Sequence, residues 1–526
     1  MITPMTILGI GGILSDAACA ILKDGKLAAA VEEKKLARRS TAGELPEQSL
    51  AACLDLAEVN ADSVECVALA RPFGDGPGAS LHLQIRARFP NSRLVVVEHH
   101  AAHAASAFYP SPFETATVLT LDRMGDFRCG GVWRGENNHL HLDKELYYPD
   151  SLGDLYGRVT ALLGYTPNAD EHKVQWLSTG GDDRFVGLFE EILGGGTDAL
   201  PRINRSYFDS DRLERGEFSG KFYEKLGIED GAAVPAALQP HVAAGIQRAT
   251  ENTVLRMAGD AESLCLAGGL GMNALLVAAL EKKRNVFVQP AAGNAGTAIG
   301  AALHAWHNVY HQIERTQLNG LCLGPSFDAE QIKRVLENCK LRFRYMLTEG
   351  EVVATAVQEL TENKIVAWMQ GRMEFGPRAL GNRSILASPL NPYSTENLNK
   401  FIKHREPFRK FAASVPAELA AEYFETGPNA RFLATVGRVK PAHRKTFESA
   451  TLGDDYVRVH TVAEADNPLY YRLLKEAGRV TGLPVLYNTS FNLFNDPLVC
   501  SPRDAARSFY SSGIDGLIVG NFFLQK

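Results

Sequence analysis

The chain contains 526 residues, of which 45% are hydrophobic and 22% are charged, and its formal net charge is −6. This length exceeds one ordinary hydrophobic core and predicts two or more domains. The acidic balance argues against general binding to nucleic acid or acidic lipid, and no apolar run reaches the roughly 18 residues that a membrane-spanning helix needs. We therefore expect a globular protein with neither nucleic acid nor membrane as a partner.

The cysteines and the first residues indicate a reducing compartment. The eight cysteines are scattered without a CxxC pair, as expected of buried thiols rather than a disulfide framework. No Lys or Arg precedes the first apolar run, and Asp16 interrupts it, unlike a secretory signal peptide. We expect a cytoplasmic protein.

Two hairpins of similar pattern are predicted in the first part of the chain. TILGIGG, CAILKDG and KLAAAVEE predict three strands, with Asp24-Gly25 as a tight turn. Near residues 115–134, an apolar strand again precedes an acidic, glycine-containing turn and a returning strand. Later, SLCLAGGLGMNALLVAAL predicts a strand, then Gly268 and Gly269, then a helix whose first N–H groups can bind an anion. Together these units resemble the duplicated nucleotide-binding fold of actin, Hsp70 and sugar kinases, an α/β fold with helices flanking parallel-containing sheets.

The pattern changes after a helix-like segment at 295–310. LTEGEVVATAVQELTENKIVAWMQG begins a new helix-then-strand unit, and the chain ends in strand-like VLYNTSFN, helix-like SPRDAARSFYSS and strand-like GLIVGNFFL. We place a domain boundary near residue 345, which gives a domain over 1–344 and a smaller α/β domain over 345–526.

A pair of histidines and an aspartate suggest a metal site. His99 and His103 are four residues apart, so both imidazoles lie on one face of a helix, and Asp122 follows in the second hairpin. Neutral imidazoles and a carboxylate form a mixed nitrogen and oxygen ligand set for a divalent ion. His100 points about 100° away and is not expected to be a ligand.

A basic segment is predicted to bind a small anion. Residues 371–410 contain eight Lys or Arg against three Glu, a local charge of +5 in an acidic protein. A solvated charged face of a helix is the alternative. Glycines at 371, 376 and 381 alternate with the arginines, which favours a loop, and loops commonly contain binding sites.

Long motifs closely resemble those of the carbamoyltransferase family of antibiotic and nodulation-factor biosynthesis. They are HHAAHAASAFYPSPF, LTLDRMGD, DEHKVQWLS, LAGGLGMN, QPAAGNAGTAIGAAL, GRMEFGPRALGNRSILASP, KHREPFRKFAASV and LYNTSFN. The resemblance implies that carbamoyl phosphate and ATP form carbamoyl adenylate in a YrdC-like C-terminal domain. The carbamoyl group then passes to a hydroxyl or amine of a small-molecule acceptor in the N-terminal domain. The cofactors implied are Mg²⁺ with ATP and a divalent metal, for which we expect Fe²⁺.

The resemblance also implies roles for individual residues. Arg378, Lys403 and Arg409 match phosphate-binding and carbamoyl-binding positions, and Arg guanidinium groups suit phosphate because they bind it bidentately. The other expected cofactor-binding residues are Asn488 and Ser490 for the adenylate, Arg372 and Arg383 as assisting cations, and Gly268, Gly269, Asn273 and Lys173 in the N-terminal domain. For Arg383 and for Lys173, structural ion pairs with neighbouring carboxylates are the alternative.

Most departures from the family pattern concern the transfer half. Ser15-Asp16 stands where His-Asp is usual, and Asn294 stands where Asp is usual, so we expect Asn294 as a weak fourth metal ligand and Asp16 as the candidate base. Arg123 follows Asp122 where a glycine is usual. Three functions therefore compete: a complete carbamoyltransferase, a subunit that hands carbamoyl adenylate to a partner carbamoyltransferase, and a non-catalytic ATP-binding scaffold. A homodimer is also compatible with the sequence.

Overall fold

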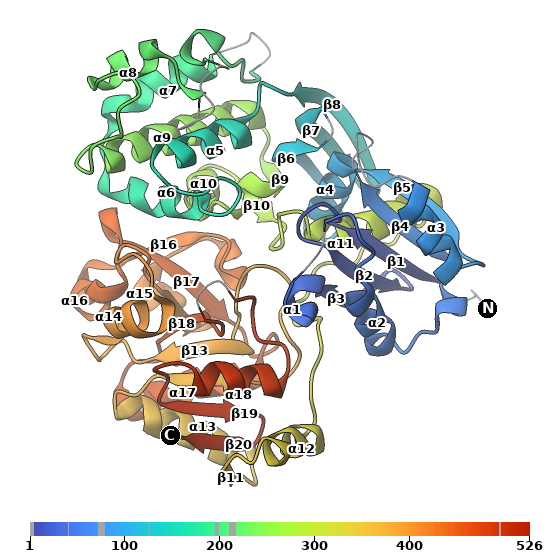
Figure 1. The fold of residues 1–526 in the computed structure, drawn as a ribbon, viewed down its shortest axis with the longest axis vertical. Helices are drawn as coiled ribbons and strands as arrows, with labels where there is room; N and C mark the ends of the chain where they lie inside the picture. The colour runs from blue at the N-terminus through green and yellow to red at the C-terminus, as the bar shows by residue number, and fades with distance from the viewer. Residues whose placement is uncertain are drawn as a thin grey trace.

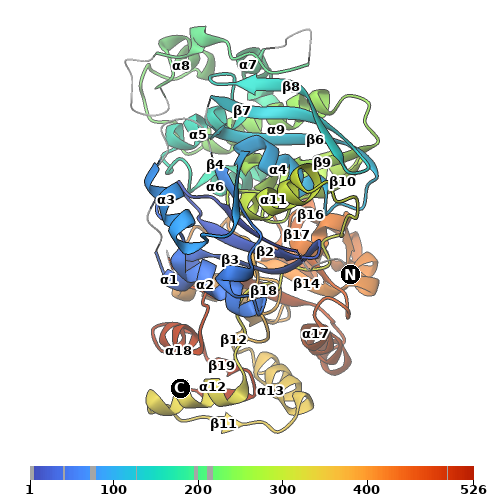
Figure 2. The ribbon, with the colours of Figure 1, turned by 90° about the vertical axis from the view of Figure 1, so that its right-hand side faces the viewer.

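The computed structural model describes residues 5–39, 42–71, 79–125, 127–194, 199–209, 217–493 and 496–526. Within these residues, the longer strands form three sheets, two in the N-terminal part and one in the C-terminal part (Figure 1). In the view turned by 90°, β6–β8 lie at the top, β2 and β3 in the middle, and α12 and β11 at the bottom (Figure 2).

The first sheet contains the predicted hairpin. Its strands, in spatial order, are β3 (Lys26–Glu32), β2 (Ala18–Lys23), β1 (Thr6–Gly11), β4 (Cys66–Arg71) and β5 (Arg93–Glu98). Strands β1 to β3 are antiparallel, whereas β4 and β5 add in parallel to β1. Asp24 and Gly25 both have positive φ, 50° and 75°, as a tight hairpin turn requires.

The second sheet repeats this topology. Its strands, in spatial order, are β10 (Asn285–Val288), β9 (Ser263–Ala267), β6 (Thr115–Gly125), β7 (Arg128–Glu136) and β8 (His139–Tyr147). An antiparallel β6–β7–β8 meander is extended by β9 parallel to β6 and by β10 parallel to β9. The same order and directions as in the first sheet confirm the predicted duplicated fold.

Two helices lie between these sheets. Helix α11 (Gly296–His304) packs on β1, β2 and β4, helix α4 (His99–Phe108) packs on β6 and β9, and the two helices pack on each other. Their crossing is close, since a Cβ at Gly300 would overlap the carbonyl oxygen of Ala102. The buried faces are rich in alanine, which permits this approach. The N-terminal end of α4 is thereby fixed against β6.

The remaining helices of the N-terminal part surround the two sheets. They are α1 (Glu33–Ala37), α2 (Glu47–Leu56), α3 (Ala79–Arg88), α5 (Leu152–Leu162), α6 (Glu171–Leu177), α7 (Val186–Leu193), α8 (Gly220–Leu226), α9 (Gln239–Ala258) and α10 (Ala274–Glu281). Helix α10 begins later than the glycine pattern predicts. A short 3₁₀ turn follows Gly268, and Asn273 caps the helix by accepting from the N–H of Leu276.

The third sheet has ten strands and forms the C-terminal part. Its strands, in spatial order, are β11 (Arg344–Tyr345), β20 (Phe522–Gln525), β19 (Gly516–Val519), β12 (Val366–Met369), β13 (Arg383–Ala387), β18 (Leu486–Ser490), β14 (Ala412–Pro416), β17 (Tyr456–Val462), β16 (Val436–Val439) and β15 (Phe424–Glu425). The α-helices are α12 (Ala329–Asn338), α13 (Glu349–Thr361), α14 (Ser394–Asn397), α15 (Ala420–Tyr423), α16 (Arg444–Phe447), α17 (Pro468–Thr481) and α18 (Pro502–Tyr510). A π-helical segment, Leu398–Lys403, follows α14.

A buried ion pair of the N-terminal part holds the loop that precedes Arg378. Lys35 pairs with Glu32, and its Nζ donates to the carbonyls of Glu374 (2.9 Å) and Gly376 (2.7 Å). The Glu32 carboxylate in turn accepts from the N–H of Gly376 at 3.2 Å. The first sheet therefore fixes the backbone of the basic segment.

Candidate metal centre and anion site

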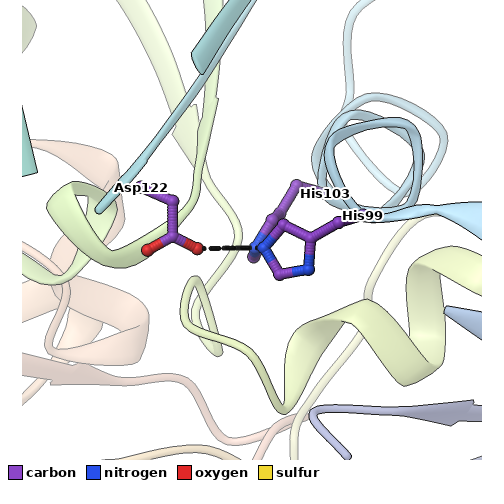
Figure 3. Close-up of side chains that lie close together, drawn as sticks. All are labelled: His99, His103 and Asp122. Carbon is purple, nitrogen blue, oxygen red and sulfur yellow. Dashed lines mark hydrogen bonds and ion pairs between the residues drawn. The ribbon is translucent and has the colours of Figure 1, made fainter. Parts of the chain in front are cut away.

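His99, His103 and Asp122 converge at the end of β6. The first two come from the N-terminal turns of α4, and Asp122 comes from β6 (Figure 3). Asp122 Oδ2 lies 3.1 Å from His99 Nε2 and 3.2 Å from His103 Nε2. One ligand atom from each residue falls within 4.8 Å of the others, a grouping that can hold one metal ion. The chemistry of this donor set fits a divalent ion.

The electrostatics of this cluster favour metal ligation. Burial lowers the pKa of His103, which keeps its imidazole neutral. Burial alone would raise the pKa of Asp122, but the hydrogen bonds from His103 and His99 hold it well below its usual range. His100 faces elsewhere, with its ring nitrogens 3.1 Å from Thr120 Oγ1 and from the Arg128 carbonyl.

Glycines allow the surrounding backbone to lie against the cluster. A Cβ at Gly125 would overlap the His99 ring, and one at Gly269 would lie 3.1 Å from Asp122 Oδ1. Gly268 has φ +91°, and a Cβ there would overlap the backbone of Leu121. These glycines therefore allow the compact packing of His99, His103 and Asp122. Their expected contact with a cofactor stays a prediction.

The other residues expected at the transfer site are placed less directly. Asn294 donates to Ser15 Oγ at 2.7 Å, and its buried Oδ1 has no hydrogen-bond partner among the described residues. Asp16 lies 2.5 Å from Lys34 Nζ, and both side chains are 41% exposed. Asp16 thus lacks the closed surroundings expected of a base. Arg123 turns toward α5, where its Nε is 3.1 Å from Asp154 Oδ1.

Five cations of the C-terminal part form a cluster with few counter-charges. They are Arg378, Lys403, Arg405, Arg409 and, on β17, Arg458. Burial and the charge of Arg409 lower the pKa of Arg378 to about 10, and burial with the charges of Arg405 and Arg409 places that of Lys403 well below its usual value. Cations that repel one another in partly buried positions form a site prepared for an anion.

The neighbours of Lys403 are polar groups at the end of β18. Lys403 Nζ donates to the carbonyls of Ser490 (2.6 Å) and Asn492 (2.9 Å) and to Asn492 Oδ1 (2.6 Å). Asn488, also on β18, donates to the carbonyl of Ala379 at 3.1 Å, next to Arg378. Its buried Oδ1 has no partner among the described residues. Lys403 therefore contacts Ser490 directly, and Asn488 contacts the residue that follows Arg378.

Two predicted cations are engaged elsewhere. Arg383 is fully buried, and its guanidinium donates to the backbone carbonyls of Gln370, Gly371, Asn382 and Pro325. Arg372 donates to the carbonyls of Ala28, Leu323 and Gly324, across the junction of the two parts. Backbone carbonyls are thus the partners of both guanidinium groups in this structure, and their expected contact with a cofactor stays a prediction.

Helix α6 adds residues of the N-terminal part to the cationic cluster. Lys173 Nζ lies 2.9 Å from Glu406 and 3.2 Å from Asp170, so it forms the ion pairs that were the alternative to a cofactor contact. Its neighbour His172 lies close to Arg409 and Arg378. Sequence reasoning missed Arg458 and His172. No motif marks Arg458, whereas His172 stands next to Lys173, which was expected to bind a cofactor.

A cavity of about 340 Å³ connects the two parts of the molecule. Its lining includes Asp16, Asn294 and Met272 from the N-terminal part and Arg378 and Ser490 from the C-terminal part. This position lets one ligand contact residues of both parts. None of the helices in the described ranges is sufficiently long and apolar to cross a membrane.

Comparison with known families accounts for most of the chain. The model described as "Carbamoyltransferase N-terminus" matches residues 79–303, and the one described as "Carbamoyltransferase C-terminus" matches residues 357–526. The His99–His103–Asp122 cluster lies within the first match, and the cationic cluster lies within the second.

Curated proteins of similar sequence match this chain over all or part of its length. An uncharacterized protein of Synechocystis is 33% identical, over 99% of this chain and 96% of its own length. The nodulation protein NolNO of Sinorhizobium fredii is 31% identical, over 98% of this chain and 79% of its own. A 3'-hydroxymethylcephem-O-carbamoyltransferase of Amycolatopsis lactamdurans is 29% identical, over 51% of this chain and 49% of its own.

Proposed function

This chain belongs to the carbamoyltransferase family and is an enzyme, and on that premise we propose that it uses ATP to activate carbamoyl phosphate and transfers the carbamoyl group to a small-molecule acceptor. The observation that carries the proposal is the cluster of Arg378, Lys403, Arg405, Arg409 and Arg458, of which Arg378 lines a cavity that also meets the N-terminal part. Carbamoyl phosphate and ATP bring several negative charges, which such a cluster stabilises.

The proposed reaction has three balanced steps. Carbamoyl phosphate and water give carbamate and inorganic phosphate. A carbamate oxygen then attacks the α-phosphorus of ATP, and pyrophosphate leaves. Finally, the acceptor hydroxyl or amine attacks the carbamoyl carbon, the bond to the adenylate oxygen breaks, and AMP and a proton are released. Lys403 and the arginines hold the phosphates in the second step, and Asn488 and Ser490 add uncharged polar contacts to the adenylate.

His99, His103 and Asp122 would hold the divalent metal, with Asn294 Oδ1 as a weaker oxygen ligand. We expect Fe²⁺ at this site and Mg²⁺ with ATP. When bound, the metal supplies a Lewis acid that polarises the adenylate or lowers the pKa of the acceptor. The low pKa of the Asp122 carboxyl keeps it ionised for this role.

A subunit that hands its adenylate to a partner is the second candidate. It is favoured by the state of Asp16, which pairs with Lys34 and is 41% exposed, so the transfer half lacks an evident base. A non-catalytic scaffold is disfavoured by the cationic cluster, because partly buried cations that repel one another destabilise a fold that does not use them.

Exchange of radiolabelled pyrophosphate into ATP tests the activation half. The purified enzyme should catalyse exchange only when carbamoyl phosphate is present, and Arg378→Ala or Lys403→Ala should abolish it. Arg479→Ala, which removes an arginine that is 71% exposed and pairs with Glu476, is the matched control and should leave exchange unchanged. No exchange by the wild type at saturating donor would refute the proposal. Exchange without carbamoylation of any acceptor in a broad hydroxyl and amine panel would favour the second candidate.

A further inference from the structure

His172 has an unpartnered nitrogen and lies close to the cationic cluster, because its neighbour Lys173 pairs with Glu406, which in turn pairs with Arg409. It lies in the first turn of α6, and its Nδ1 is 3.0 Å from the carbonyl oxygen of Ala169. Its Nε2 is buried and has no hydrogen-bond partner among the described residues. A buried polar atom without a partner is uncommon and calls for a ligand.

The contact with Ala169 fixes which nitrogen carries the proton. A carbonyl oxygen only accepts, so Nδ1 must donate and therefore bears the hydrogen. In the neutral imidazole, Nε2 then has a lone pair and can only accept. The unpartnered nitrogen is thus a hydrogen-bond acceptor.

The charges around the ring keep it in this form. Burial, followed by the positive charges of Arg409 and Arg378, lowers the pKa of His172 to about 4, and Asp170 opposes this shift. Near neutral pH, the imidazole is therefore an uncharged acceptor close to Arg378 and Arg409, which only donate. Arg and Lys side chains offer no acceptor atom at all.

We propose that His172 Nε2 accepts a hydrogen bond from the amino group of the carbamoyl donor and so selects a carbamoyl group over an acyl group. This inference rests on the proposed function, because it assumes that the carbamoyl donor binds between Arg378 and Arg409. The oxygens of the donor match the cations, whereas its –NH₂ group needs an acceptor, which the cations cannot supply. A donor with a methyl group in place of –NH₂ leaves Nε2 without a partner, at the cost of one buried hydrogen bond.

A pair of stable phosphonates tests the inference without catalysis. Phosphonoacetamide carries –NH₂ where acetonylphosphonate carries –CH₃, and the two are otherwise alike in shape and charge. Calorimetric titration of the wild-type enzyme should give a Kd about tenfold lower for the amide than for the ketone, as expected of one hydrogen bond. His172→Phe should raise the Kd of the amide to that of the ketone and leave the ketone unchanged.

Two further variants separate recognition from structure. His172→Gln restores a side-chain acceptor and should recover part of the preference for the amide. His141→Phe changes a histidine that is 69% exposed, on β8, and should keep the full preference.

The outcomes that overturn the inference are distinct. Equal weakening of both phosphonates by His172→Phe would mean a merely structural role. Retention of the preference would assign the amino group to another acceptor, such as the unpartnered Asn488 Oδ1. Loss of ATP affinity with the preference retained would assign His172 to the nucleotide. Binding of neither phosphonate to the wild type would refute the donor site itself, and the proposed function with it.

Discussion

Replacement of Lys35 by methionine should uncouple the basic loop from the N-terminal part. Lys35 and Glu32 are each only 4% exposed, and Lys35 donates to the carbonyls of Glu374 and Gly376. Gly376 lies two residues before Arg378 in the sequence. Methionine has a similar length and no charge, so Lys35→Met leaves the Glu32 carboxylate buried without its partner. Breaking a buried pair in this way costs about 3–5 kcal/mol. We expect a lower midpoint of thermal unfolding and a fall in pyrophosphate exchange of roughly 100-fold, since the backbone that presents Arg378 is no longer held.

Two controls determine whether this reasoning holds. Lys333→Met removes one partner of an exposed pair with Glu337, each 56% exposed, and should change stability by no more than about 1 kcal/mol. The double variant Glu32→Gln, Lys35→Met removes the unpaired charge and should recover much of the stability of the single variant. Unchanged stability and exchange in Lys35→Met, or a double variant no better than the single one, would refute the coupling.

Three more predictions concern the two clusters. Gly125→Ala forces the His99 ring away from its position. We therefore expect elemental analysis to show a substantial loss of bound metal, as in a His99→Ala, His103→Ala double variant. Full metal content in these variants would contradict the metal site. Lys403 is charged only below its pKa, and burial with the neighbouring arginines holds that pKa well below its usual value. The affinity for carbamoyl phosphate should therefore fall as the pH rises through this lowered pKa. Lys403→Arg should move the fall to higher pH. An unshifted profile in the arginine variant would argue against Lys403. Arg458→Met should lower pyrophosphate exchange at least tenfold. It should not reduce the midpoint of thermal unfolding, because it relieves the repulsion of Arg458 from Arg378, Arg405 and Arg409. A large loss of stability would mean a structural role for Arg458.

The duplicated fold was predictable because its signals are local. Asp24-Gly25 is a turn pair that requires positive φ, and the alternation around it is that of paired strands. The grouping of His99, His103 and Asp122 was also predictable, since helical spacing sets the first two and the following strand supplies the third. Both features depend on short stretches of chain.

Arg372 and Arg383 show what local reasoning leaves open. A basic motif does not reveal whether a guanidinium group contacts a ligand or backbone carbonyls. Here the Leu323 carbonyl accepts from Arg372, and the Gln370 carbonyl accepts from Arg383. Arg458 was missed for the opposite reason. It is a single cation in a strand, and only the pairing of β17 with β14 brings it to the cluster.

The position of α6 bears on the choice between a complete enzyme and a subunit that hands on its product. Lys173 of α6 pairs with Glu406 of the cationic segment, and His172 lies close to Arg378 and Arg409. Lys35 of the first sheet holds the loop before Arg378. The proposed activation site thus adjoins residues of the part that contains His99, His103 and Asp122. A subunit that only released its adenylate would not need its activation site assembled from both parts, whereas an enzyme that passes the adenylate through the shared cavity does. The contacts across the junction therefore favour the complete carbamoyltransferase.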